Sequence, residues 1–486
     1  MQILSQRSWR RADASPTLVL VIVCAGVVLA SLDLFIVNVA LPDMARDLHA
    51  RSLGDLSWVL NGYAIVYASL LVLFGRLSES HRRENGFLLG VLVFTAASAA
   101  CGAADSLTML VVFRIVQAAG AALLTPTSLS LVLATSAPER RQSSVRAWTA
   151  IGGLAAALGP VVGGLLVAAS WRWVFLVNVP IGLLAVLVGA RRLPVVAGHS
   201  VPRPDALGAT LITVGVAALT LGLVKGNDWG WAALPTLGAL AASALALALF
   251  ALHTARHHNP LIDGALFRVR SFSGSSVVAL VFSIAFGAML LSIVLWDQQV
   301  WGWSALQTGL AVAPGPLMVP LFSFLVAGRL IARFGPGPVI AVGATVYAAG
   351  VAWWALRAGA TPNYVGEMLP GMLMTGVGVG LTLPTFMSAG AASLPPQSFA
   401  TGSAVVNMLR QVGLAVGVAV LVAVIGAPVS EAARVSAFHH GWIVISATAV
   451  LAALSGAVVL RTPGRDRESA RWWPAAAHRR AAPERR

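Results

Sequence analysis

Charged residues are scarce in this chain: they make up 10% of its 486 residues, whereas 58% are hydrophobic and the mean hydropathy is +0.82. Soluble globular domains carry about 25% charged residues, so this composition argues against a soluble protein. The only two cysteines, Cys24 and Cys101, lie inside apolar runs and offer neither a disulfide framework nor metal-ligand spacing. The sequence also lacks a Gly-x-x-x-x-Gly-Lys-Ser/Thr phosphate loop and a repeated selectivity element, which argues against an ATP-driven pump and a channel.

Fourteen apolar runs divide the chain, from one near Leu18–Ala40 to one near Trp442–Leu460. The hydrocarbon core of a bilayer is about 30 Å thick, so a helix of roughly 20 apolar residues crosses it. The sequence therefore predicts an all-α integral membrane protein with fourteen spans. The first run is expected to be retained as an anchor, because it is too long for a signal-peptide core and further runs follow it.

Basic residues are distributed unevenly between the two sides of these runs. If the N-terminus is cytoplasmic, 25 of the 33 Lys and Arg residues fall inside and six outside, while Arg114 and Arg410 lie within runs. This positive-inside bias predicts that both termini are cytoplasmic and that the protein is a multi-pass protein of the inner (cytoplasmic) membrane. It also accounts for the net charge of +15 without a nucleic-acid partner.

Short motifs of the first six runs recur in the last six. Gly75-Arg76-Leu77, at the end of the second run, corresponds to Gly328-Arg329-Leu330 at the end of the tenth. Transporters are built from such repeats, with the substrate site between them near the middle of the membrane. The predicted organisation is a cytoplasmic segment 1–17, a six-helix bundle 18–190, a linker with two extra membrane helices and basic loops 191–272, a second six-helix bundle 273–461, and a basic cytoplasmic tail 462–486 that is expected to be disordered.

Asp33 is an acidic residue inside the first apolar run. A carboxylate in hydrocarbon is costly, so an acid that is retained there is a candidate functional residue. On a helical wheel it shares a stripe of small residues with Gly26 and Ala30, so it faces protein or a cavity rather than lipid. Asp33 is predicted to carry a transported proton; the alternative is a carboxylate that only hydrogen-bonds a neighbouring helix.

A polar stripe follows one face of the fourth run and includes Arg114, Gln117 and Thr125. An arginine inside the membrane needs a counter-charge or a set of carbonyls. Asp33 is the nearest plausible acid in the same half, so Arg114 is predicted to act with Asp33 in proton coupling. Gln117 and Thr125 are predicted to line a substrate cavity. The alternative is an arginine that only holds helices together.

The fifth run carries two rows of small residues, which allow close helix packing. Pro160 removes a backbone hydrogen bond and permits a kink. Close packing with a kink suits an element that moves and must seal against leak, although ordinary packing of a glycine-rich helix is the alternative. The residues expected to matter here are Gly152, Gly159, Pro160, Gly163 and Gly164.

Other polar residues are candidates for the substrate cavity. Asp297, just after the ninth run, is either an outer-boundary residue or a second acid in the cavity, and Glu367 near the twelfth run leaves the same choice open. Residues of the thirteenth run either line the cavity or bond to neighbouring helices. The remaining cavity candidates are Asn38, Asn407, Arg410 and Gln411.

Several motifs, taken in this order, resemble those of the drug/proton antiporters with fourteen spans, a group of the major facilitator superfamily. Residues 32–42 are similar to the first-helix signature of that group, and residues 114–120 to its fourth-helix arginine motif. The glycines of 152–164 resemble the antiporter motif of the fifth helix. Further matches are residues 171–180, residues 267–272, and Asn407 with residues 410–413.

The resemblance implies a major facilitator fold, with two six-helix halves plus two inserted helices, and a multidrug or antibiotic exporter. One loop departs from the pattern. The family's loop after the second helix reads Gly-x-Leu-x-Asp-Arg-x-Gly-Arg, and here Glu79 replaces the acid and Arg82 the turn glycine. Gly75, Glu79 and Arg83 are the expected gating residues, and the second copy of the loop has Ala332 in place of the acid.

The predicted function is proton-coupled efflux, by antiport, of hydrophobic small molecules such as drugs or antibiotics, through alternating access. The alternative is a proton-coupled uptake symporter of the same superfamily, because fold does not fix direction. The expected partners are the hydrophobic substrate, protons and the lipid bilayer, with the protein a monomer. Enzymatic activity, cofactors and metals are not expected; the proton gradient supplies the energy. His253, His257 and His258 are interpreted as a solvated loop.

Overall fold

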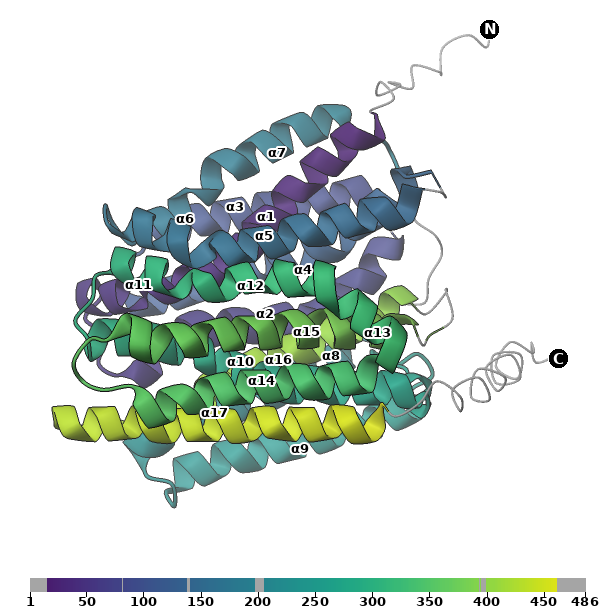
Figure 1. Cartoon of the computed structure of the whole chain (residues 1–486). Coiled ribbons are helices and arrows are strands. Elements are labelled where there is room, and N and C mark those ends of the chain that lie inside the picture. Colours follow the sequence, from purple (N-terminus) through teal and green to yellow (C-terminus); the bar gives the residue numbers. More distant parts are fainter. Residues whose placement is uncertain are drawn as a thin grey trace, which may run out of the picture.

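The structure, a computed structural model, describes residues 15–80, 82–137, 140–196, 205–392, 394 and 399–460. In this part of the chain every regular element is a helix (Figure 1). The first seven helices are α1 (Pro16–Asp47), α2 (Leu53–Ser80), α3 (Arg83–Gly102), α4 (Leu107–Thr135), α5 (Arg141–Val167), α6 (Trp173–Leu176) and α7 (Asn178–Arg192). Two further helices follow, α8 (Ala206–Trp229) and α9 (Leu234–Arg256).

The rest of the chain forms a second series of helices, several of which are interrupted. A 3-10 turn, η2 (Gly264–Arg268), precedes α10, and π-helical turns, η3 (Ser323–Ala327) and η4 (Tyr364–Met368), interrupt or precede others. The α-helices are α10 (Arg270–Gln299), α11 (Ala305–Val312), α12 (Pro314–Phe322), α13 (Gly328–Phe334), α14 (Pro336–Arg357), α15 (Leu369–Ala392), α16 (Phe399–Ile425) and α17 (Glu431–Val459).

Serine hydroxyls define several helix starts. Ser15, Ser106 and Ser430 accept hydrogen bonds from backbone N–H groups in the first turns of α1, α4 and α17. Ser304 and Gln307 form a reciprocal capping box at the start of α11. Such caps satisfy N–H groups that have no partner within the helix, while the apolar stretch that follows satisfies its own backbone polar groups, as hydrocarbon demands.

Thirteen helical stretches in the described part of the chain are long and apolar enough to cross a membrane. The remaining predicted span corresponds to α5, whose shorter described apolar stretch is Leu158–Val167. Figure 1 shows that α1 begins and α17 ends on the same side of the bundle, as an even number of crossings requires. The count of fourteen, and the division into bundles, stay predictions.

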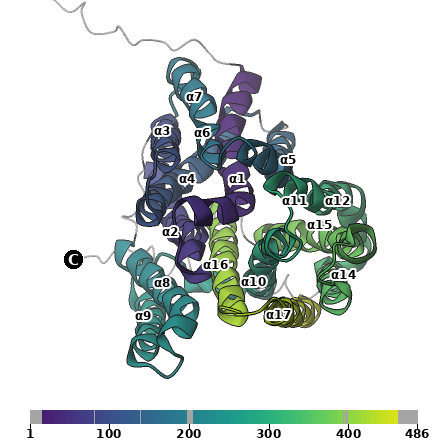
Figure 2. The same ribbon diagram turned by 90° about the vertical axis from the view of Figure 1, so that its left-hand side faces the viewer.

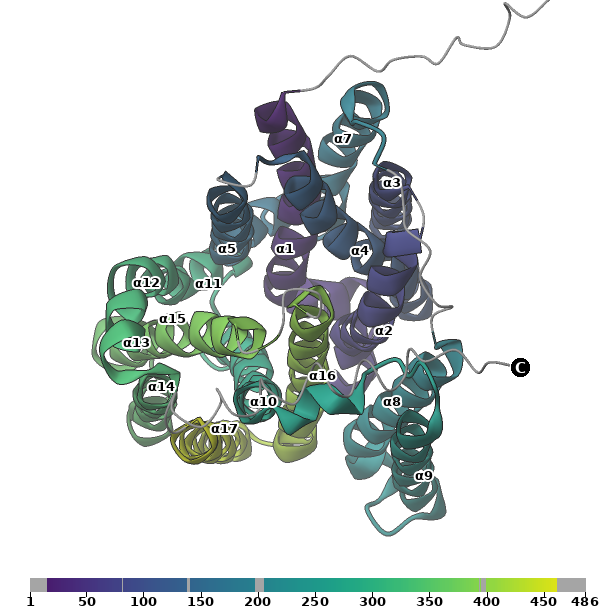
Figure 3. The ribbon, with the colours of Figure 1, turned by 90° about the vertical axis from the view of Figure 1, so that its right-hand side faces the viewer.

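The helices pack in two groups that meet along two seams (Figure 2). In one group α1 packs against α5 and α4 against α2 and α3; in the other α10 packs against α16 and α17, and α14 against α15. The seams between the groups are α2 against α16 and α5 against α11. Seen from the opposite side, the α8–α9 pair lies at a corner of the molecule, where α8 contacts α2 and α16 (Figure 3).

The seam between α5 and α11 is made by small residues. A Cβ atom on Gly164 would lie 2.8 Å from the Ala305 carbonyl oxygen, and one on Gly309 would collide with the carbonyl group of Pro160. Close by, Gln298 at the end of α10 donates a hydrogen bond to the Val39 carbonyl, at 3.1 Å. These contacts join the two groups at the end of the bundle that the charge distribution predicts to be extracellular.

Candidate functional site

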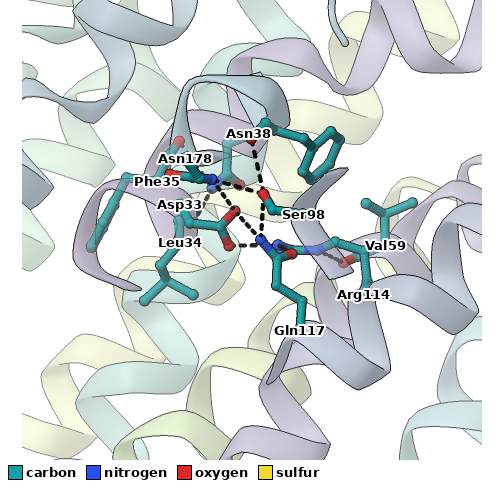
Figure 4. Close-up of polar contacts among 10 residues, drawn as sticks. Asp33, Leu34, Phe35, Asn38, Val59, Ser98, Arg114, Gln117 and Asn178 are labelled. Carbon is teal, nitrogen blue, oxygen red and sulfur yellow. Dashed lines mark hydrogen bonds and ion pairs between the residues drawn. The ribbon is translucent and has the colours of Figure 1, made fainter. Parts of the chain in front are cut away.

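Asp33 and Arg114 form an ion pair in the interior of the first group of helices (Figure 4). The Arg114 Nη1 atom lies 2.5 Å from Asp33 Oδ2, and both side chains are 0% exposed. Arg114 also donates from Nε to the Val59 carbonyl on α2, at 3.2 Å, and from Nη1 to Gln117 Oε1, at 2.7 Å. The predicted pairing of Arg114 with Asp33 is therefore confirmed; its role in proton coupling stays a prediction.

The carboxylate of Asp33 is surrounded by amide donors as well. Gln117 Nε2 donates to Asp33 Oδ1 at 2.9 Å, and Asn178 Nδ2 donates to the same oxygen at 3.4 Å. Both amides also donate to the hydroxyl of Ser98, which in turn donates to the Phe175 carbonyl. An ionised carboxylate only accepts hydrogen bonds, so this set of donors matches the charged form of Asp33.

Four helices contribute to this network: α1 through Asp33, α3 through Ser98, α4 through Arg114 and Gln117, and α7 through Asn178. Gln117, predicted to line a substrate cavity, is completely buried beside Asp33. Ser98 and Asn178 were not among the predicted site residues. A hydroxyl in an apolar run carries little signal, whereas Asn178 stands in the motif 171–180.

One face of the Arg114 guanidinium lies over the ring of Tyr63 on α2, with the Cζ atom 4.1 Å from the ring centroid. This cation–π contact stabilises the charge without a second acid. Nη2 is buried and has no hydrogen-bond partner among the described residues. Among the described residues, Asp33 therefore supplies the only carboxylate that pairs with the guanidinium.

Tyr63 stacks on Tyr67, one helical turn away, with centroids 5.9 Å apart and an interplanar angle of 12°. The Tyr67 hydroxyl donates to Thr125 Oγ1 at 3.1 Å, and its side chain lies near Asn407 on α16, which packs against α2. Asn407 Oδ1 accepts from Arg410 Nε at 3.0 Å. A continuous row of side chains thus leads from the ion pair of the first group to α16 in the second.

The other cavity candidates differ in their surroundings. Asn38 folds back on its own helix and donates to the Leu34 carbonyl at 3.1 Å. Gln411 is 2% exposed, and its Oε1 has no hydrogen-bond partner among the described residues. Asp297 is also 2% exposed, with Oδ1 unpartnered, near the end of α10. Glu367 accepts from the backbone N–H of Gly359 at 2.7 Å and thereby holds a loop.

The glycines of α5 lie against two other helices. Cβ atoms on Gly159 and Gly163 would lie 2.7 Å from Phe35 Cβ and 3.0 Å from the Ile36 carbonyl oxygen, next to Asp33 on α1. Gly164 faces α11, as described above, and a Cβ on Gly152 would lie 3.0 Å from a methyl group of Val27. The helix α5 is therefore held closely between the segment of α1 that carries Asp33 and the seam with the second group.

The expected gating residues are only partly visible. Gly75 lies on α2, where an added Cβ would be 3.8 Å from Pro126, and the Arg83 backbone N–H donates to the Val196 carbonyl at 3.2 Å. The Arg83 Nε atom is buried without a hydrogen-bond partner among the described residues. The side chain of Glu79 lies outside the described residues. The predicted latch therefore stays a prediction.

The interpretation of His253 as part of a solvated loop was wrong. It lies in the last turn of α9, and its Nε2 atom is 2.9 Å from Asp205 Oδ1, because Asp205 caps α8 and faces the end of α9. His257 is close enough that these three residues could hold a metal ion. The Asp205 carboxylate already accepts hydrogen bonds from the N–H groups of Gly208 and Leu261, which fits a structural contact between the start of α8 and the end of α9.

Comparison with known proteins places this geometry in context. The family model of the Major Facilitator Superfamily matches residues 23–418. The chain is 33% identical over 408 residues to the tetracenomycin C resistance and export protein of Streptomyces glaucescens, covering 84% of this chain and 75% of that one. It is 33% identical over 414 residues to the methylenomycin A resistance protein of Streptomyces coelicolor, with coverages of 85% and 86%.

A further relative is the multidrug resistance protein Stp of Mycobacterium tuberculosis, at 32% identity over 406 residues and coverages of 83% and 74%. Among solved structures, an auto-inhibited peptide transporter of the POT family superimposes with a TM-score of 0.65. It covers 91% of this chain and 96% of its own at 17% identity. That likeness shows the fold alone.

Proposed function

The chain belongs to the major facilitator superfamily of membrane transporters, and from this premise we propose that it exports hydrophobic small molecules in exchange for protons. It is a multi-pass protein of the bacterial inner membrane and a transporter rather than an enzyme. Relatives that share most of its length are named for antibiotic export or resistance, which supports efflux of drug-like molecules. The proposed driving force is the proton gradient, and the proposed working unit is a monomer.

The observation that carries the proposal is the buried ion pair of Asp33 and Arg114. Protonation of Asp33 removes the charge that holds the guanidinium, so the pair has two arrangements that differ by one proton. An exchanger needs an element of this kind, whose equilibrium a proton can shift. An acid this deep in a membrane helix is a typical proton-carrying site.

The packing of α5 suggests how that change reaches the rest of the molecule. Gly159 and Gly163 contact α1 two to three residues from Asp33, and Gly164 contacts α11 of the second group. A shift of α1 on protonation therefore acts on the helix that closes the seam. In the proposed cycle substrate enters from the cytoplasm or inner leaflet, Asp33 exchanges it for an external proton, and the two halves rock.

Inverted membrane vesicles with an acidified lumen test this proposal. Tetracenomycin C and methylenomycin A, for which two relatives are named, serve as the added probes. Antiport predicts that each transported probe releases protons from the lumen, whereas a symporter would carry protons inward with the probe. Asp33→Asn should abolish the release, and Asp105→Asn, an exposed aspartate between α3 and α4, should not. Unchanged release by Asp33→Asn, or a pH change of opposite sign in the wild type, would refute the proposal.

A further inference from the structure

Arg410 stands on the face of α16 that lies between α2 and α10. Val412 and Ala415 on one side of α16 pack with residues of α2 and α8. Gly413 on the other side packs against α10, where an added Cβ would lie 2.8 Å from Ser283 Cβ. With 100° between successive residues, Asn407, Arg410 and Gln411 fall between these two contact lines, and they therefore share the face of α16 between α2 of one group and α10 of the other.

The charge of Arg410 is not balanced by any described acid. Among the described residues only its Nε atom has a hydrogen-bond partner, Asn407 Oδ1, and no described carboxylate lies within ion-pair distance. The described acids on the α-helices packed against α16 all lie near the predicted extracellular end. They are Asp55, Asp228, Asp297 and Glu431.

Helix geometry shows how far away one of these acids, Asp297, lies. Gly417 contacts Ile284 on α10, which runs parallel to α16, and Asp297 lies 13 residues beyond Ile284. Arg410 lies seven residues before Gly417, so the separation along the helix axes is about 30 Å at 1.5 Å per residue. Arg114, by contrast, has Asp33 at 2.5 Å. A cation so deep in a membrane protein is expected to face a cavity or a partner.

A second polar group beside Arg410 also lacks a partner. Gln411 is 2% exposed, and its Oε1 accepts no hydrogen bond from a described residue. It lies one turn from Asn407 on the same side of α16. With respect to the described residues, Arg410 Nη1 and Nη2, together with this amide, thus offer unused hydrogen-bonding capacity in one place, within one turn of Asn407.

We propose that Arg410, with Asn407 and Gln411, binds an anionic oxygen group of the exported molecule, such as a carboxylate, enolate or phenolate. The planar guanidinium with two free amino groups suits a carboxylate, which it can bind through two parallel hydrogen bonds. This inference rests on the proposed function, because it names the class of substrate. Tyr63 and Tyr67 separate the anion subsite from Asp33, so anion binding does not require the proton site.

Equilibrium binding to the full-length protein tests the subsite without a proton gradient. The probes are 1-pyrenebutyrate, a fluorescent hydrophobic carboxylate at pH 8, and its uncharged methyl ester. Binding is followed by energy transfer from tryptophan in nanodiscs of phosphatidylcholine, which contain no lipid of net negative charge, and partitioning into empty nanodiscs is subtracted. The wild type should bind the carboxylate at least tenfold more tightly than the ester.

Variants show which residue causes the preference for the carboxylate over the ester. Arg410→Gln should reduce this preference to within about twofold. Arg410→Lys should keep part of it, because lysine retains the charge but not the two amino groups of the planar guanidinium. Arg357→Gln, at the predicted extracellular end of α14, is the matched control and should leave the preference unchanged. A thermal unfolding transition like that of the wild type shows that Arg410→Gln is folded. Arg410→Lys is a second test, which keeps the positive charge at this position.

Equal affinity of the wild type for both probes, absence of carboxylate binding, or a full preference in Arg410→Gln overturns the inference. The proposed function is tested separately by proton release in vesicles. Asp33→Asn should keep the carboxylate preference while losing proton release. If the wild type prefers the carboxylate but substrate does not release protons, only the proposed exchange is refuted. If substrate releases protons but the wild type has no preference for the carboxylate, only the subsite is refuted.

Discussion

Removing one partner of the Asp33–Arg114 pair should destabilise the protein strongly, because the other charge then stays buried without a charged partner. Removing both partners should cost less than the sum of the two single losses. In Asp33→Asn the guanidinium of Arg114 keeps its contacts with Val59, Gln117 and the Tyr63 ring but has no charged partner. Both side chains are fully buried, so solvent cannot compensate for the loss. Removal of one partner of a buried pair typically costs about 3–5 kcal/mol of the free energy of unfolding.

The geometry sharpens this expectation. Asp33 Oδ2 accepts from Arg114 and Oδ1 accepts from Gln117, at 2.5 and 2.9 Å. An asparagine has one oxygen and one amino group, so in one of these two contacts the amino group would face another N–H donor and no hydrogen bond could form. Arg114→Gln leaves the carboxylate with its amide donors alone. The double variant Asp33→Asn with Arg114→Gln has no buried charge left here, and we expect it to be more stable than the sum of the single losses predicts, by about 1.5–3 kcal/mol.

The assay is reversible unfolding of the purified protein in mixed micelles with increasing denaturing detergent, for the wild type, both single variants and the double variant. Asp105→Asn and Arg357→Gln serve as exposed controls and should change stability by less than about 0.5 kcal/mol. Substrate-driven proton release is measured on the same preparations. Additive losses within about 0.5 kcal/mol would show that the two side chains do not interact energetically, and the proposed switch would lose its basis.

Three further predictions concern neighbouring features. Gly164→Ala, whose Cβ would lie 2.8 Å from a backbone oxygen of α11, should lower the free energy of unfolding by about 1–3 kcal/mol, whereas Gly153→Ala, with nothing within 4 Å, should not; equal effects would contradict the close seam. Tyr63→Leu should impair transport and Tyr63→Phe should not, because phenylalanine retains the ring face under the guanidinium; equal transport rates in both would argue against the cation–π contact. Burial raises the pKa of Asp205, but hydrogen bonds from Gly208, His253 and Leu261 outweigh it and hold the pKa below its usual 3.8. The stabilisation from Asp205 is therefore complete above about pH 4 and is lost as the pH falls further. Asp205→Asn should lower the free energy of unfolding at pH 7 and reduce the loss of stability seen below about pH 4. An unchanged loss of stability at acid pH in the variant would refute this.

The sequence by itself determined the membrane architecture and the centre of the site. Long apolar runs and the placement of arginines are read directly from the order of residues, because a bilayer requires each span to be long, apolar and internally hydrogen-bonded. The cost of charge in hydrocarbon made Asp33 and Arg114 conspicuous before any distance was known. Their pairing followed because few other charges lie inside the spans of the first half.

Only the tertiary structure decided which uncharged residues join them. Ser98 and Asn178 reach Asp33 from α3 and α7, and neither residue type is rare or costly enough in a membrane helix to be noticed alone. The same holds for the row of Tyr63 and Tyr67. Arg410 was a candidate from the sequence, but only the structure shows its hydrogen bond to Asn407 and the packing of its helix against α2 and α10. Helical periodicity fixes which residues share a face, but the partner of that face depends on contacts between segments distant in sequence. Tertiary packing therefore decided that Arg410, unlike Arg114, has no carboxylate partner in the described part of the chain.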